Sequence, residues 1–507
     1  MPTMDTAITI EPYFTRTGWD NESKTFKFAN DLCQSSPMSP EYLAQLQLLL
    51  QENKNVARWE CTEINCGYIL LYTALKHDQP IEVIQLLVNA WQESVFYKDG
   101  FSIFALHMAC HYSSHMDVIR FLMDRNPKAL AAATFNGDLP IHYAARKIKQ
   151  SQPILELLIN AAPATLMKRR FENYTVLHCL LQYFIVNLEL VQCIAERWGG
   201  ALRTLNDKHE TPLHMACEKQ PAPVILYLLK KFKKAACMVD KNGQFPLHHL
   251  CKSNSSPIVL VARDLIEAFP HAVRHRDVNG SLPINSLPLF EAEGTSELIQ
   301  YMVDMVPYSL LAQNNNGYLP IHMACLAQNE EMVVWMASRV PLSLTYENKY
   351  GKLPLHYLLS KDSPQVANEL SIATMVQAFP PIISMGSFQF KPFDMAIRYG
   401  MTETGSIMAN SYPRAIQMVV TDTGRNALHY ACIRGYTDMI LQLVVLCPAA
   451  AANTDDYNYL PLHYACEHHP LLPQHVIQNL VLAYTLACCK SCPRIKFHGY
   501  NYEADSD

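Results

Sequence analysis

The chain has 507 residues, of which 50% are hydrophobic and 17% charged, so it can bury a sizeable core and lacks the composition of a disordered protein. Its 41 Lys and Arg against 46 Asp and Glu give a net charge of -5, which provides no general attraction for nucleic acid or an anionic membrane. A single core of this size would be unusual, since cores stop growing near about 250–300 residues. The chain therefore contains either several domains or a repeat array.

The N-terminal segment, residues 1–38, is aperiodic, and we expect most of it to be extended or partly disordered. It begins MPTMDTAITIEPYF, with no basic leader before an apolar block, so we expect no secretory signal. Ser39 and Pro40 then suit the N-cap and the first position of a helix. We assign residues 39–55 to a capping half-repeat helix that covers the first repeat.

A short motif recurs through residues 56–483. Good copies are LPIHYAA at 139–145, TPLHMAC at 211–217 and LPLHYAC at 460–466. Its His position is occupied in twelve copies by residues 72, 107, 142, 178, 214, 248, 285, 322, 356, 394, 429 and 463. The steps between them lie between 34 and 38 residues, which indicates a repeat array.

Each repeat shows the same order of local signals. Proline stands just inside the motif in eight copies, where it suits the first position of a helix. Two residues before the helix cap, a residue that tolerates positive φ predicts a tight turn. These residues are Gly67, Gly137, Gly243, Gly280, Gly317, Gly351, Gly424, Asn173 and Asn458. An amphipathic run such as 117–125 follows the motif and predicts a second helix that ends at a proline. The chain is therefore expected to be an all-α helix-turn-helix repeat solenoid, stabilised by stacking of neighbouring repeats.

This unit resembles the ankyrin repeat, whose pattern centres on Thr-Pro-Leu-His-x-Ala after a Gly turn, and residues 211–216 match that pattern. The resemblance covers about residues 56–483 and implies an ankyrin-type solenoid, a curved rod roughly 100 Å long. Two features depart from the family. The mean step is about 35.5 residues rather than 33, with the extra residues around the prolines. The Thr position is mostly Leu or Phe, which puts the family's Thr–His hydrogen bond in doubt. We expect these apolar residues to offset the lost cap, worth about 1 kcal/mol, by packing between repeats.

The repeated His and Cys residues are expected to be structural. The period holds the His residues one repeat apart, so they cannot converge on a metal or a substrate. The Cys three positions later behaves as a small core residue in Cys110, Cys217, Cys251, Cys325, Cys432 and Cys466. No nucleophile elbow, P-loop or HExxH motif occurs, so we expect no enzyme and no cofactor.

The C-terminal tail, residues 484–507, leaves several readings open. Cys488, Cys489, Cys492 and His498 are weak metal candidates, and the alternatives are ordinary packing or S-acylation of the cysteines. The apolar stretch 468–489 carries no Lys, Arg, Asp or Glu but contains prolines and amides, so we expect a buried helix rather than a membrane span. The basic runs 168–170 and 230–234 are either solvated surface or a docking patch for an acidic partner.

The resemblance implies a protein–protein interaction scaffold that binds partners through its hairpin tips and the concave face of its first helices. Tip candidates are Phe135, Arg169, Arg170, Phe171, Tyr174, Tyr318, Tyr346, Lys349, Tyr350, Tyr457 and Tyr459, and concave-face candidates are Arg146, Lys147, Tyr399 and Arg434. Further candidates at tip and first-helix positions of the repeats include Asp138, Asp240, Asp277, Asp455 and Arg398. Aromatic residues beside charged ones are the composition of binding hot spots.

The alternatives to this scaffold are a membrane-associated adaptor tethered by acylated tail cysteines and a regulatory subunit of an enzyme complex. We expect a cytoplasmic monomer in a reducing compartment, with the nucleus as an alternative location. We expect its partner to be a protein of unknown identity. No nucleic-acid partner is expected, and no membrane association except through the tail.

Overall fold

The computed structural model describes residues 29–31, 33–34, 40–52, 54–58, 69–146, 151–183, 185–253, 258–287, 295–359, 369–386, 391–418, 423–469 and 472–491. The chain divides into two compact units, Met1–Pro212 and Leu213–Asp507. Most of the expected N-terminal segment and residues 492–507 of the tail lie outside the described residues.

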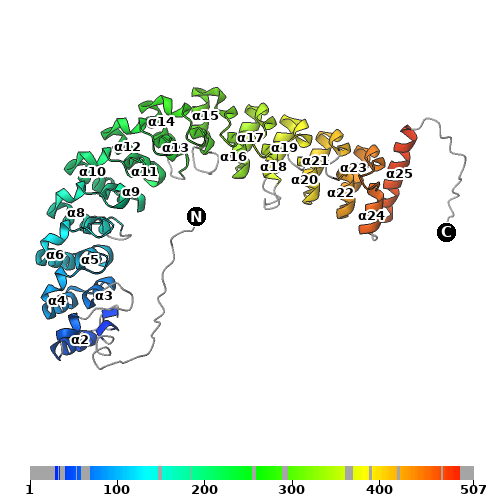
Figure 1. Cartoon of the computed structure of the whole chain (residues 1–507). Coiled ribbons are helices and arrows are strands. Elements are labelled where there is room, and N and C mark those ends of the chain that lie inside the picture. The colour runs from blue at the N-terminus through cyan, green and yellow to red at the C-terminus, as the bar shows by residue number, and fades with distance from the viewer. Residues whose placement is uncertain are drawn as a thin grey trace. The chain divides into compact units, whose positions relative to one another are not determined.

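Within each unit the helices form two rows (Figure 1). In unit 1 the first row is α3 (Leu70–Lys76), α5 (Ala105–Tyr112), α7 (Pro140–Ala144) and α9 (Val176–Tyr183). The second row is α4 (Ile81–Ala90), α6 (Met116–Arg125), α8 (Ser151–Ala161) and α10 (Leu188–Arg197), preceded by α2 (Pro40–Glu52), which packs against α4. A helix thus begins at Pro40, where Ser39 and Pro40 predict a helix start.

Unit 2 continues the same alternation. Its first row is α11 (Pro212–Lys219), α13 (Pro246–Cys251), a 3-10 turn at Pro283–Asn285, α16 (Pro320–Leu326), α18 (Pro354–Leu358), α20 (Pro392–Arg398), α22 (Ala427–Arg434) and α24 (Pro461–His468). Its second row is α12 (Ala222–Lys231), α14 (Ile258–Ala268), α15 (Thr295–Met305), α17 (Glu330–Arg339), α19 (Glu369–Ala378), α21 (Thr402–Ser411), α23 (Thr437–Leu446) and α25 (Gln474–Ser491). The described residues form helices and no strand, which confirms the all-α repeat solenoid.

The turn before most first-row helices has the predicted backbone conformation, and Gly67, predicted for the first of these turns, lies outside the described residues. Gly137, Gly243, Gly280, Gly317, Gly351 and Gly424 all have positive φ, as do Asn173 and Asn458. Two repeats reach the same conformation without either residue type, at Ser102 and His209. A side chain at Gly317 would also meet the backbone of Asn348 at 2.8 Å, so close contact between neighbouring turns adds to the requirement for glycine there.

The prolines after the second-row helices begin a turn of their own. Every second-row helix from α4 to α23 is followed by a five-residue 3-10 turn, such as Pro127–Ala131, Pro307–Leu311 and Pro448–Ala452. Its third residue is buried and mostly small, as in Ala129, Ser309 and Ala450.

The His at the third position of the first-row helix links its own repeat to the next one. In His107, Nδ1 accepts a hydrogen bond from the Phe104 N–H at 3.2 Å, and Nε2 donates to the carbonyl oxygens of Ala132 and Asp138 at 3.1 and 3.2 Å. A carbonyl only accepts, so Nε2 carries the proton and the ring is neutral. The same two bonds are made by His178, His248, His322 and His429.

This bond explains why the cap residue need not be Thr. The His side chain already accepts the hydrogen bond of the cap's N–H, as the third residue of a capping box does. Leu139, Leu319 and Leu353 at the cap are buried, which confirms that they pack in the core. Where Thr is present, the family's bond also forms, with Thr175 Oγ1 lying 2.7 Å from His178 Nδ1.

Other residues at the His position make the same link. The Tyr72 hydroxyl donates to the Ile103 carbonyl oxygen at 2.6 Å. Asn285 Oδ1 accepts from the Leu282 N–H at 2.9 Å, and its Nδ2 donates to the Ala312 carbonyl at 3.5 Å. Asp394 is the exception, because a buried carboxylate can accept the first bond but has no proton to donate for the second. Burial raises the pKa of the Asp394 carboxyl to about 7, against the opposing effects of Arg398 and Lys391.

The C-terminal end differs from expectation in two respects. The Cys position is buried in Cys110, Cys217, Cys251, Cys325 and Cys432, as predicted, but Cys466 is exposed. Cys466 lies on α24, and no further first-row helix follows α24 in the described residues to cover it. The last helix, α25, continues to Ser491 and so past the expected start of the tail at 484.

The buried-helix expectation for 468–489 holds for one face of α25. Val476, Leu480 and Ala483 are buried, whereas Leu482 and Leu486 are exposed. No helix among the described residues combines the length and the apolar character needed to cross a membrane.

The neutral histidines predict loss of stability in mild acid. Burial lowers the pKa of His107, His178 and His322 from 6.5 to about 4, so between these values the unfolded chain binds protons that the folded chain does not. Their contribution is complete above about pH 6.5 and falls towards pH 4, by at most about 1.4 kcal/mol per pH unit for each histidine. Urea unfolding followed by circular dichroism should show a falling midpoint between pH 7.5 and 4.5. In His322→Asn, which retains both bonds without titrating, the fall should be smaller. An unchanged midpoint in the native chain would contradict this account.

Asp394 predicts a stabilising substitution. Its pKa is raised from 3.8 to about 7, so its cost to folding is absent below about pH 3.8 and complete above about pH 7. Asp394→Asn should make both bonds that Asn285 makes, and should stabilise the chain at pH 8 by about 1–3 kcal/mol. The gain should be much smaller at pH 4, when both measurements use urea unfolding. Asp438→Asn, on the exposed surface of α23, is the matched control and should change neither midpoint. A gain at pH 8 no greater than that of the control would refute the explanation.

Candidate partner-binding surface

In seven of the described tip turns, a side chain at the start of the turn accepts two backbone hydrogen bonds. Asp99 Oδ1, for example, accepts from the N–H groups of Phe101 and Ile103 at 2.9 and 2.8 Å. The same arrangement is made by Asn206, Asp240, Asp277, Asn314, Asn348 and Asp455. The turns of Phe135 and Phe171 begin instead with Thr134, whose Oγ1 accepts one bond from the Asp138 N–H at 3.2 Å, and with Arg170. Asp240, Asp277 and Asp455 are buried. The expectation that these three aspartates face a partner is therefore wrong: they hold the turn.

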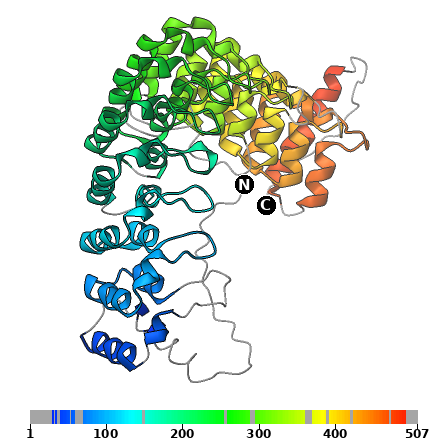
Figure 2. The same ribbon diagram turned by 60° about the vertical axis from the view of Figure 1, so that its left-hand side comes forward.

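Neighbouring tips are also bonded to one another within each unit. In unit 1, the Phe135 N–H donates to the Phe101 carbonyl oxygen at 3.1 Å and the Phe171 N–H to that of Asn136 at 2.7 Å. In unit 2, the Lys349 N–H donates to the Asn316 carbonyl at 3.0 Å. Figure 2 shows the unit 1 loops, in cyan, projecting from the same side of their helices. Since only backbone atoms make these bonds, the side chains at the tips remain available for other contacts.

Three phenylalanines occupy consecutive bonded tips of unit 1. Phe101, Phe135 and Phe171 expose 53%, 76% and 66% of their surface. We call this set the phenylalanine stripe. Phe135 and Phe171 were predicted from their column, whereas Phe101 was missed because it lies six residues before its repeat's His rather than seven. In this repeat the glycine, Gly100, lies two residues before Ser102, and it is Ser102 that has the positive φ.

Four other candidates of unit 1 contact one another within and between repeats instead. Asp138 is buried and forms ion pairs with Arg146 from its own repeat and Arg170 from the next tip, where Arg170 Nε lies 3.1 Å from Asp138 Oδ1. The Arg170 guanidinium also stacks over the Tyr174 ring at 5.3 Å. Tyr174 is only 3% exposed, so its assignment to a partner contact is wrong. Arg146 and Arg170 are half-buried.

The remaining candidates are mostly accessible. Phe135, Arg169, Phe171, Lys349, Tyr350, Tyr399, Arg434, Tyr457 and Tyr459 are exposed, and Tyr318 and Tyr346 are half-buried. Tyr399 and Arg434 line one cavity of about 350 Å³ together with Arg398. Lys147 lies outside the described residues. Tyr318 accepts a hydrogen bond from the Tyr357 hydroxyl at 3.0 Å, so this ring is held by the next repeat.

The tail candidates are only partly described. The side chain of Cys488 on α25 is half-buried and makes a hydrogen bond with the Tyr484 hydroxyl. The side chain of Cys489, and Cys492 and His498, lie outside the described residues. The metal, packing and acylation readings of the tail therefore stay expectations.

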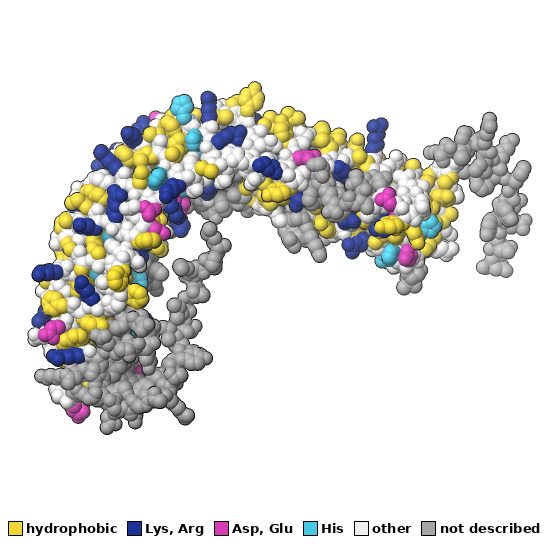
Figure 3. All heavy atoms as spheres, viewed as in Figure 1, with side chains coloured by type: hydrophobic (Ala, Val, Ile, Leu, Met, Phe, Trp, Pro, Cys, Tyr) yellow, Lys and Arg dark blue, Asp and Glu magenta, His cyan; other side chains and the backbone are white. Residues whose placement is uncertain are grey.

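Most basic residues of the two runs are exposed. Lys168 and Arg169 are exposed, and so are Lys230, Lys231, Lys233 and Lys234. Over the second-row helices of unit 1, Figure 3 shows basic side chains separated by hydrophobic ones rather than gathered in one patch. Solvated surface and a docking patch for an acidic partner both stay predictions for these two runs.

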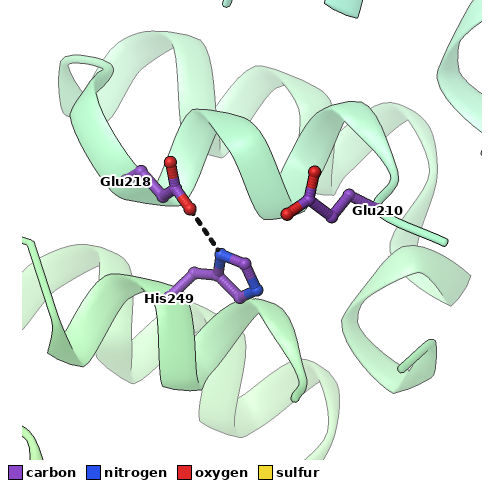
Figure 4. Close-up of side chains that lie close together, drawn as sticks. All are labelled: Glu210, Glu218 and His249. Carbon is purple, nitrogen blue, oxygen red and sulfur yellow. Dashed lines mark hydrogen bonds and ion pairs between the residues drawn. The ribbon is translucent and has the colours of Figure 1, made fainter. Parts of the chain in front are cut away.

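Unit 2 contains a buried, charged histidine outside the repeated His position. His249 lies one residue after the linking His248. Its Nδ1 lies 3.0 Å from the carboxylate of Glu218 (Figure 4), and its Nε2 lies 3.2 Å from the carboxylate of Asp240. Burial disfavours the charged ring, but the hydrogen bonds to Asp240 and Glu218 outweigh it and raise the pKa of His249 to about 9. Both ring nitrogens lie within hydrogen-bond distance of carboxylates, which fits an imidazolium that donates one hydrogen bond to each. Glu210, also drawn in Figure 4, belongs to unit 1 and accepts a bond from Asn206 Nδ2 at 2.7 Å.

Comparison with known proteins gives the following likenesses. A family model described as ankyrin repeats matches residues 70–170, 177–266 and 393–483, more than half of the chain. The ankyrin repeat protein nuc-2 of Neurospora crassa is 27% identical over 157 residues, which are 31% of this chain and only 14% of the length of that relative. A solved complex of the predatory endopeptidase Bd0816 of Bdellovibrio bacteriovorus with immunity protein Bd3460 contains a chain that aligns over 96% of its length. That alignment covers 39% of this chain, with a TM-score of 0.32 and 19% identity, and does not bear on function.

The charged state of His249 predicts an alkaline loss of stability. Its folded pKa of about 9 lies above the ordinary 6.5, so the ion pairs contribute fully below about pH 6.5 and are lost as the pH rises through about 9. The urea midpoint of the native chain should fall between pH 6.5 and 9.5, and His249→Gln should flatten that fall. His475→Gln, an exposed site on α25, is the control and should leave the native pH dependence. An equally steep fall in His249→Gln would exclude this histidine as the cause.

Proposed function

This chain belongs to the ankyrin-repeat family, and from that premise we propose that it is a non-enzymatic scaffold that binds a protein partner through its tip loops and the adjoining first-row helices. Ankyrin repeats are generally protein–protein interaction modules, and the family is typically non-enzymatic. The single observation that carries the proposal is the phenylalanine stripe on the bonded tips of unit 1.

Exposed aromatic side chains on a rigid backbone are suited to binding. Each ring of the stripe has most of its surface in water. Burying a ring in an interface would remove that apolar surface from water with little loss of side-chain entropy. The turns are already fixed by Asp99 and by the bonds between tips, so little backbone entropy is lost on association. Exposed Arg169 lies two residues before Phe171 and supplies charge at the edge of the stripe.

We also propose that the protein works in the cytoplasm, as a monomer in a reducing compartment. The described cysteines are free, and those of the first-row helices fill the core except for Cys466. Free core cysteines are compatible with a compartment that keeps thiols reduced. Fractionation of cells that express a tagged full-length chain would test this location.

The test of the scaffold proposal is loss of a specific partner on removal of the stripe. The full chain and the double variant Phe135→Ser/Phe171→Ser are compared by affinity capture with quantitative mass spectrometry. A protein bound through the stripe should be captured at least about tenfold less by the variant, since central aromatic contacts exceed about 1 kcal/mol each. Tyr308→Ser is the matched control, because Tyr308 is 81% exposed but lies in a 3-10 turn away from the tips.

Circular dichroism should show that all three chains are equally folded. If every protein captured by the native chain is captured equally by the double variant, the stripe is not the binding surface. If capture of the partner falls equally in Tyr308→Ser, the exposed aromatic residues contribute only non-specific adhesion.

A further inference from the structure

The two tips that carry Phe135 and Phe171 lack the turn-holding side chain found in seven other tips. Eight residues before the His position, those seven have an Asp or Asn that accepts two backbone hydrogen bonds. The tip of Phe135 has Thr134 at this position, and the tip of Phe171 has Arg170, whose guanidinium carries no acceptor and cannot make these bonds. The two most exposed rings of the phenylalanine stripe therefore stand on turns that are ordered in another way.

An ion pair joins these two tips. Arg170 Nε lies 3.1 Å from Asp138 Oδ1, and Asp138 belongs to the tip of Phe135, three residues further along the chain. The side chains of Arg170 and Asp138 expose only 14% and 4% of their surface, so water and salt screen this pair far less than an ion pair on the open surface. Arg170 is also tied to its own turn, because its N–H donates to the Tyr174 carbonyl oxygen at 2.9 Å and its carbonyl oxygen accepts from the Asn173 N–H at 3.0 Å.

Neighbouring groups fix the direction of both charged side chains. The Arg170 guanidinium stacks over the ring of buried Tyr174, whose centroid is 5.3 Å away. The Asp138 carboxylate also pairs with Arg146, just after α7, and the Asp138 carbonyl oxygen accepts from His107 Nε2 at 3.2 Å. Asp138 thus contacts three consecutive repeats. Because a stacked guanidinium is planar and held in direction, its pair with Asp138 sets the relative placement of the two tips.

The two rings follow this placement because the charged residues are part of the same turns. Phe171 comes directly after Arg170, and its N–H donates to the backbone of the neighbouring tip at 2.7 Å. Phe135 lies in the turn that ends at Asp138, and the Thr134 N–H closes that turn by donating to the Asp138 carbonyl oxygen at 2.9 Å. A shift of Arg170 relative to Asp138 would therefore move one ring relative to the other.

We propose that Asp138 and Arg170 are positioning residues of the binding surface, and that their ion pair holds the tips of Phe135 and Phe171 in the arrangement that a partner recognises. The inference rests on the proposed function, since these residues act on the partner through the stripe and not by contact. Rings that are already held in place lose less freedom on association, so the pair contributes to affinity although neither charge touches the partner.

The test combines hydrogen exchange with partner capture, both in the full chain. Arg170→Gln removes the charge from the tip of Phe171. Exchange of the Phe171 and Asn173 amides, measured by mass spectrometry on fragments that cover residues 168–174, should become about tenfold faster, the factor that corresponds to a hydrogen bond to a charged group. The proteins whose capture falls in Phe135→Ser/Phe171→Ser should be captured about threefold less by Arg170→Gln, in which both rings are intact.

Further variants separate positioning from general stability. Arg170→Lys keeps a charge opposite Asp138 but not the planar fork, and should restore part of the exchange protection and part of the capture. Adding Arg170→Gln to Asp138→Asn should change exchange little, because the pair is already broken in Asp138→Asn. Arg120→Gln is the matched control, an exposed arginine on α6, and should equal the native chain in both measurements. Circular dichroism and exchange at the Asp240 tip of unit 2 should be native in every variant.

Native exchange of the Phe171 tip in Arg170→Gln would overturn the inference, and so would native capture by a variant whose tip exchanges faster. Equal acceleration by Arg170→Gln with and without the Asp138 carboxylate would also contradict it, because Arg170 would then act independently of the pair. In these cases loss of capture by Phe135→Ser/Phe171→Ser would leave the proposed function standing. If that double variant captured every protein as the native chain does, the proposed function itself would fail and the positioning role with it.

Discussion

The fold depends on one hydrogen-bonded side chain at the third position of the first-row helix. His107 and its equivalents satisfy the N–H of the residue that caps their own helix and a carbonyl of the next repeat. Both partners are buried backbone groups, so leaving either unbonded would cost about 1–3 kcal/mol. The bond thus ties local helix initiation to stacking between repeats. Tyr72 and Asn285 keep this link by different chemistry, which shows that the geometry of the position matters more than the identity of the residue.

The sequence was sufficient to predict most of this architecture because its signals are local and repeated. Proline at the helix start, Gly or Asn in the turn, and the apolar period of the second helix each act within a few residues, and their recurrence averages out the poor copies. The prolines indicated only where the second helix ends. They did not predict the five-residue 3-10 turns that follow, since a helix and a 3-10 turn have similar periodicity. The positive φ of Ser102 and His209 was not predicted, because the surrounding turn imposes this conformation on residue types that do not favour it.

The candidate site was less predictable, because the position of a residue within its repeat does not reveal its neighbours in space. Tyr174 and Arg170 occupy tip columns, yet the Asp138 carboxylate of the preceding repeat draws Arg170 inward and Tyr174 packs beneath it. Phe101 occupies the tip surface although its spacing departs by one residue. Arg398, Arg425 and Arg434 lie in different turns and helix ends, and only packing of α20 against α22 reveals that they share a cavity. Such convergence between repeats has no signature in a single repeat.

The backbone bonds between tips have a consequence for how this chain can change. At one bonded tip position the chain itself carries Phe135, Phe171, Asp207, Val278, Asn315, Lys349 and Asp456. Aromatic, acidic, amide, aliphatic and basic groups are thus interchangeable there, because the amide and not the side chain makes the bond. Recognition and foldability are encoded by separate atoms of the same residue. Point substitutions at the tips can therefore redirect what the protein binds with little penalty in folding, which makes the surface highly evolvable.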